Sequence, residues 1–183
     1  MYRLLIPVFL LIGRMAAAQT PTPNVISQPQ YYDKGHSALV KLDKCVAKYG
    51  THTKGMGLGG YSITYDLNGD KATTRLQIPE NGSFVVLMAD GTGDPTAWFS
   101  LFKAEIKKGK RSAAYVQGKT GMVSAKQEAG NGIIPFEVKS LGKNLYEIIP
   151  SAKLGTGEYL FINKGTMSNY GGQGADAFAF GID

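Results

Sequence analysis

The sequence predicts an all-β fold, an antiparallel β-sandwich of the Ig-like or jelly-roll-like kind, with a closed β-barrel as the alternative. Two observations predict it. Short strand-like runs follow one another between residues 38 and 182, and Gly, Asn, Asp and Pro separate them. No long segment carries the apolar period of 3.6 residues that is typical of a helix. We expect residues 37–183 to form a single β-sandwich domain.

Residues 1–18 have the composition of a secretory signal peptide. Arg3 provides a charged start, residues 4–12 form an apolar run, and three alanines at 16–18 precede Gln19. The apolar run is shorter than the roughly 20 residues that a membrane-spanning helix needs. We therefore expect cleavage near Ala18, no membrane span afterwards, and a mature protein in the periplasm or outside the cell.

Residues 19–36 contain Pro21, Pro23 and Pro29, which predicts a Pro-rich linker and entry into the domain. The whole chain has 20 Lys and Arg against 14 Asp and Glu, and the leader contributes two of the arginines. The mature chain is thus mildly basic, which does not by itself indicate a nucleic-acid partner. Cys45 is the single cysteine, so an intrachain disulfide is excluded and packing must hold the fold. We expect Cys45 to be buried.

The clearest strand covers residues 61–68, where apolar and polar residues alternate. Asn68 and Gly69 then match a type I′ turn, and residues 73–78 match a return strand. The sequence therefore predicts a hairpin with one buried face.

Further strands are expected along the rest of the chain. Residues 83–89 lack alternation, which predicts burial on both faces, and Pro135 favours an edge strand or a bulge within 133–139. Residues 177–182 alternate large apolar with tiny side chains, so one face fills a core and the other allows close approach. The remaining predicted runs are 97–106, a hairpin tip at 107–110, 111–117, 145–149 and 157–163, with one helical turn within 120–129.

The strongest charged feature is the basic tip Lys107, Lys108, Lys110 and Arg111. It predicts contact with an anionic envelope polymer or a phosphate-bearing surface. The alternative is a solvated tip whose lysines prevent edge aggregation. Tyr170 lies in the Gly-rich segment 165–174, a predicted loop, and completes the candidate binding surface.

Other motifs are weaker. Tyr31, Tyr32, Tyr159 and Trp98 could supply a stacking surface. His36 and His52 lack the spacing of metal ligands, and the Gly-rich segment 55–60 precedes a strand, where a dinucleotide site needs a helix. Asp90 and Asp94 flank a Gly-rich turn that could hold calcium, although ordinary turns have the same composition. We assign no catalytic, cofactor-binding or metal-binding residue.

Several short motifs resemble a family of exported bacterial β-sandwich proteins. They are Asp94-Pro95 with Leu101-Phe102-Lys103 and the tip at 107–111, and Gly157-Glu158-Tyr159 with the ending Phe180-Gly181-Ile182-Asp183. Phe102 stands where family members often have Tyr. The resemblance implies an exported β-sandwich and implies no catalytic residues.

The sequence favours an exported, non-enzymatic binding module. We expect it to bind a protein or cell-envelope component through loops and strand edges, as a monomer or weak oligomer. The alternative is a secreted hydrolase acting on glycan or peptide, for which a pair of carboxylates would be needed across a cleft. The available glutamates are Glu105, Glu128, Glu137, Glu147 and Glu158.

Overall fold

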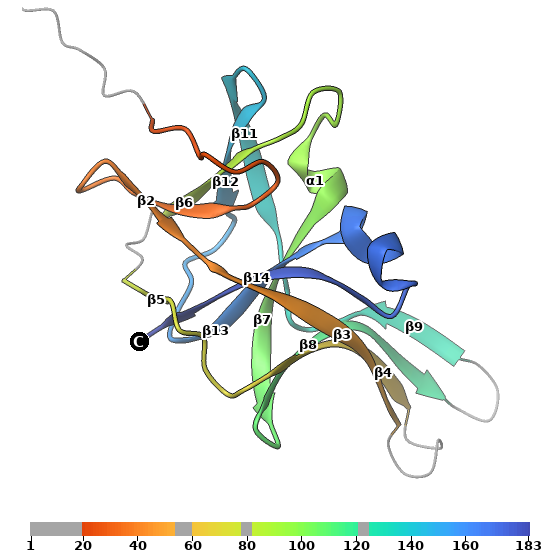
Figure 1. Cartoon of the computed structure of the whole chain (residues 1–183). Helices are drawn as coiled ribbons and strands as arrows, with labels where there is room; N and C mark the ends of the chain where they lie inside the picture. The colour runs from red at the N-terminus through yellow and green to blue at the C-terminus, as the bar shows by residue number, and fades with distance from the viewer. Residues whose placement is uncertain (1–19, 54–59, 78–81, 121–124) are drawn as a thin grey trace, which may run out of the picture.

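The computed structural model describes residues 20–53, 60–77, 82–120 and 125–183, and it is an all-β sandwich of two sheets (Figure 1). The predicted leader and most of the Gly-rich segment 55–60 lie outside the described residues. Within the described ranges, no helix has the length and apolar character needed to cross a membrane.

The smaller sheet has five strands in the order β11-β12-β6-β1-β2, and the larger sheet has the order β10-β7-β13-β14-β3-β4-β8-β9 with β5 beside β14. The strands are β1 (Gln30–Asp33), β2 (Ala38–Lys41), β3 (Asp43–Thr53), β4 (Tyr61–Asn68), β5 (Arg75–Leu76), β6 (Ser83–Leu87), β7 (Phe99–Lys107), β8 (Lys110–Thr120), β9 (Ala125–Ala129), β10 (Ile133–Ile134), β11 (Phe136–Gly142), β12 (Leu145–Pro150), β13 (Gly157–Asn163) and β14 (Gly174–Ile182). Two short helices are α1 (Pro95–Trp98) and the 3₁₀ helix η2 (Lys164–Tyr170).

The larger sheet curls on itself without becoming a clear barrel. β7 pairs with β13 from Phe99 to Ala104, and it pairs with β8 only from Glu105 to Lys107. The sandwich prediction is therefore confirmed over the barrel alternative.

Two apolar cores lie on opposite faces of the larger sheet, and β14 divides them. Phe178 and Phe180 belong to the core between the two sheets, whereas Ala177 and Ala179 belong to the second core inside the curl. Phe84 of the smaller sheet lies with its ring centroid 5.0 Å from that of Phe180. The predicted division of β14 into a large and a tiny face is confirmed. Both faces of β6 are buried along Ser83–Val86, as predicted.

The predicted hairpin over residues 61–78 is wrong in its second half. β4 pairs with β3 and β8, while β5 runs parallel to β14. Of the two predicted turn residues, only Gly69 has a positive φ, at 81°. The amides of the next residues find side-chain partners elsewhere: Ala72 N–H donates to Glu158 at 2.8 Å and Thr74 N–H to Asp43 at 3.1 Å. These bonds draw the chain away from β4.

The type I′ geometry occurs at the basic tip. Lys108 and Gly109 have φ of 51° and 72°, and Lys107 pairs with Lys110 across the turn. The predicted β7–β8 hairpin is therefore confirmed.

Two further expectations need correction. Residues 125–129 form the strand β9, where a helical turn was expected, because they pair with β8. The expected loop at 165–174 contains η2, which Asn163 caps by accepting the Gly165 N–H. The edge strand that Pro135 favoured within 133–139 is confirmed: Pro135 separates β10, at an edge of the larger sheet, from β11, at an edge of the smaller one. The range 19–36, expected as linker and domain entry, contains the strand β1.

Candidate functional site

A pocket of about 430 Å³ lies beside the β7–β8 tip. Figure 1 shows this tip at the bottom, remote from the smaller sheet. The pocket draws its walls from β3, β4, β7 and β8 and is lined by His52, Asp66, Lys107, Lys108, Lys110 and Ser112.

Asp66 forms the polar centre of the pocket. Its Oδ1 accepts hydrogen bonds from Thr64 Oγ1 at 2.8 Å and from Ser112 Oγ at 2.7 Å. Its Oδ2 lies 3.4 Å from His52 Nε2, which is longer than the usual N–H···O distance of about 3.0 Å. The side chain is 18% exposed. The carboxylate is thus fixed through one oxygen and faces the pocket with accepting capacity on the other.

Gly50 makes room for this arrangement. A Cβ built at Gly50 would collide with Asp66 Oδ2 and would lie 2.8 Å from Thr64 Oγ1. Strand pairing explains the proximity, since Gly50 pairs with Thr64, and Asp66 pairs with Ser112 on the other side. A side chain at position 50 would cover the oxygen that faces His52.

Three predicted lysines come together at the pocket. Lys107, Lys108 and Lys110 all line it, and Lys107 Nζ forms an ion pair with Glu105. Lys107 remains 62% exposed at its side chain. Among the described lining residues, three ammonium groups lie beside one carboxylate, which is an excess of positive charge.

Arg111 does not belong to this surface. It is 7% exposed and points to the opposite face of β8, where Nε and Nη2 donate to the carbonyl oxygens of Gly69 and Asn68 at 3.3 Å. Its Nη1 lies 3.9 Å from Glu158 Oε2 and makes no hydrogen bond. The prediction that Arg111 is part of the basic binding surface is therefore wrong, because its side chain is buried.

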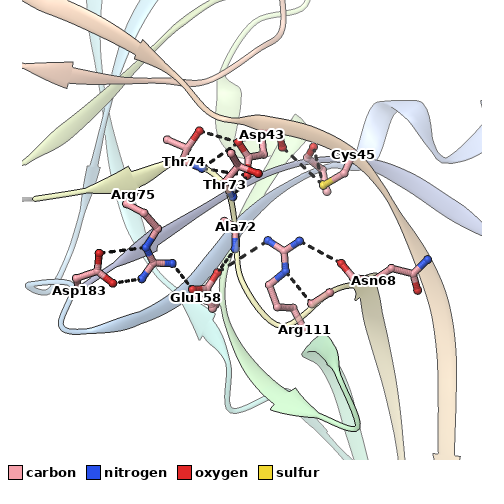
Figure 2. A network of polar contacts seen from close by, with 12 residues as sticks. Asp43, Cys45, Asn68, Ala72, Thr73, Thr74, Arg75, Arg111, Glu158 and Asp183 are labelled. Carbon is pink, nitrogen blue, oxygen red and sulfur yellow. Dashed lines mark hydrogen bonds and ion pairs between the residues drawn. The ribbon is translucent and has the colours of Figure 1, made fainter.

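Arg111 belongs to a polar network under the segment that leads into β5 (Figure 2). Glu158 accepts from the Ala72 amide and from Arg75, and Arg75 also pairs with Asp183. These bonds to its two carboxylate partners raise the pKa of Arg75. The network fastens residues 72–75 across the end of the curled sheet.

The predicted aromatic sites are separate from the pocket. Tyr170 does not line it, and its hydroxyl donates to Asp176 at 2.6 Å, which raises the pKa of Tyr170. Tyr31, Tyr32 and Tyr159 are at most 8% exposed, so they do not form a stacking surface. The indole N–H of Trp98 donates to the Thr92 carbonyl oxygen at 2.7 Å.

The remaining candidate groups have local partners. Asp94 caps α1 by accepting the Thr96 N–H, and Asp90 accepts from Asn144. His36 is paired with Asp33. In the part of the chain that the structure describes, no group of three His, Cys, Asp or Glu residues is placed to hold a metal ion.

Cys45 is half-buried, where burial was expected. Its thiol donates to the Ala177 carbonyl oxygen over 3.7 Å. Burial raises the pKa of Cys45 to about 11, with Arg111 opposing the shift and Asp43 adding to it. The thiol is therefore protonated at neutral pH and is a weak nucleophile.

The described lining residues of the pocket do not pair a nucleophile with a base. A serine nucleophile needs a base such as histidine to take its proton, but Ser112 donates to Asp66, and His52 lies on the carboxylate's other oxygen. Hydrolysis of a glycan by paired carboxylates would need two, whereas Asp66 is the one carboxylate among the described lining residues.

The glutamates considered for a hydrolase are held in separate places. Glu105 pairs with Lys107, Glu158 lies in the network with Arg75, and Glu147 accepts from Ser83 Oγ at 2.6 Å. Glu137 lies on β11, and the side chain of Glu128 is outside the description. None of these contacts of Glu105, Glu147 and Glu158 brings two carboxylates together.

Sequence reasoning found the lysines and missed His52, Asp66 and Ser112 as pocket residues. The lysines are adjacent in the sequence, whereas the other three come together only through the register of β3, β4 and β8. The alternation within residues 61–68 placed Asp66 on a polar face, which was the one available signal. Comparisons with protein-family models, with curated proteins and with solved structures found no match to this chain.

Proposed function

We propose that this chain is an exported, non-enzymatic β-sandwich module that binds an anionic component of the cell envelope through the pocket at the β7–β8 tip. The observation that carries the proposal is the gathering of Lys107, Lys108 and Lys110 around one pocket. Clustered ammonium groups attract anions and raise their local concentration. The signal-peptide composition of residues 1–18 and the resemblance to exported bacterial proteins support the envelope as the setting.

The geometry also supports a binding role over a hydrolytic one. The β7–β8 hairpin carries the lysines on and beside a tight two-residue turn, so the backbone that presents them is ordered before a ligand binds. The carboxylate and the hydroxyls of the pocket already hydrogen-bond one another.

The experiment compares two double variants with equal charge change. Lys108 and Lys110 are replaced by Gln in the first, and Lys143 and Lys153 in the second. Lys143 is a matched control because it occupies a hairpin turn with φ of 50°, close to the 51° of Lys108. Lys153 is exposed on the loop after β12.

The chain is purified from the exported fraction of a bacterial host, its N-terminus is read by mass spectrometry, and binding to an anionic envelope fraction is measured at two salt concentrations. Each lysine near an anionic surface contributes roughly 1 kcal/mol. The pocket variant should therefore bind about 30-fold more weakly, and the control should bind like the wild type. Equal losses in both variants would contradict the pocket as the site, and a product beginning at Met1 would contradict export.

A further inference from the structure

We infer that the ligand of this pocket is an acidic glycan, whose anionic groups contact the lysines and whose hydroxyl groups donate to Asp66. The inference rests on the proposed function and names the chemical class of its ligand. It starts from the juxtaposition of three lysines with Asp66 among the described lining residues of the same pocket.

A site for a simple anion gains nothing from Asp66. The carboxylate repels phosphate and carboxylate groups that the lysines attract. Yet Asp66 is built into the wall, since two hydroxyl donors from Thr64 and Ser112 hold its Oδ1. A fixed acceptor inside a cationic pocket matches a ligand that presents donors as well as negative charge.

Oδ2 of the carboxylate has a long contact with His52 in the ion-pair geometry and can accept from such a donor as well. Gly50 has no side chain to cover Oδ2, and the His52 ring nitrogen stands 3.4 Å away. A sugar hydroxyl can donate to a carboxylate oxygen in a short, charge-assisted hydrogen bond. Polyphosphate and the phosphates of DNA offer acceptors where Asp66 needs a donor, so the pocket favours an acidic sugar polymer over them.

The test uses Asp66→Asn, which keeps an oxygen that can accept from Thr64 and Ser112 and removes the negative charge. Binding is measured to alginate, an acidic glycan, and to linear polyphosphate, an anion without hydroxyl donors along its chain. The inference expects opposite changes. Alginate binding should fall about tenfold, as expected when a hydrogen bond to a charged group is lost, and polyphosphate binding should be unchanged or stronger because a repulsive charge is gone.

A second variant keeps the charge. Gly50→Ala places a methyl group against Asp66 Oδ2. It should weaken alginate binding and leave polyphosphate binding close to that of the wild type. Thermal unfolding confirms that each variant is folded, and Gly50→Ala decides the question where Asp66→Asn fails to fold.

Each other outcome overturns the inference in a distinct way. Stronger binding of both polymers by Asp66→Asn would show that Asp66 only repels, and equal loss for both would show a structural role; the proposed function survives either result. A wild type that binds polyphosphate more tightly than alginate would refute the glycan while keeping the anion site. A wild type that binds neither polymer would overturn the inference and the proposed function together.

Discussion

The buried ion pair between Arg111 and Glu158 should show a large asymmetry when its two members are replaced one at a time. Both side chains are 8% exposed, and Arg111 Nη1 lies 3.9 Å from Glu158 Oε2 without a hydrogen bond. Glu158 also accepts from Ala72 N–H and pairs with Arg75. Glu158 therefore has other partners for its charge, whereas Arg111 has the carbonyl oxygens of Asn68 and Gly69 and no second carboxylate within ion-pair distance among the described residues.

The magnitude follows from these contacts. At 3.9 Å and an effective dielectric constant of about 20, the attraction is roughly 4 kcal/mol. Glu158→Gln leaves the guanidinium of Arg111 buried without its counter-charge, so we expect a loss of about 3–5 kcal/mol in the free energy of unfolding. Arg111→Met leaves Glu158 paired with Arg75, and we expect a loss of about 1 kcal/mol.

The assay is urea unfolding of the two single variants and of the double variant. Once Arg111→Met is present, Glu158→Gln should cost much less than it does alone, and the double-mutant cycle measures the coupling. Glu137→Gln is the control, because Glu137 is exposed on β11 and its loss should stay within about 0.5 kcal/mol. A Glu158→Gln variant that is as stable as Arg111→Met would refute the reasoning.

Two more predictions concern stability. Gly130→Ala should destabilise the fold by more than about 2 kcal/mol, because its methyl group would collide with the backbone carbonyl of Ala114, whereas Gly155→Ala meets open space and should melt near the wild-type temperature. Burial raises the pKa of Glu147, but hydrogen bonds from Ser83 and Lys34 outweigh burial and hold that pKa below its ordinary value. Its contribution to stability is therefore present above the unfolded pKa of about 4.3 and is lost as the pH falls through the lower folded pKa. Thermal unfolding between pH 7 and pH 3 should show a smaller acid-induced loss in Glu147→Gln than in the wild type, and equal losses would contradict this assignment.

Strands were predictable where the apolar pattern of the segment itself indicates which of its faces are buried. Residues 157–163 form β13 with the predicted bounds, because their apolar run fills both cores at once. The partners of the strands were less predictable. Asn68-Gly69 has the composition of a hairpin turn, yet Glu158 and Asp43, remote in the sequence, accept the amides that follow. Tertiary hydrogen bonds overrode a local preference there.

The basic tip shows how the period of a strand decides which charges serve the site. β8 begins at Lys110, so Lys110 and Ser112 point to the pocket side while Arg111 points into the curled sheet. The four basic residues of the tip therefore have two roles. The three lysines line the pocket, whereas Arg111 is buried and forms an ion pair with Glu158. The division follows from alternation alone, once the turn is placed at Lys108-Gly109. In a run of charged residues at a hairpin, the turn residues should be identified before the charges are assigned to a face. Shifting this turn by one residue would place Arg111 at the pocket in the position of Lys110. Glu158 would then face a lysine, which has fewer hydrogen-bond donors than an arginine.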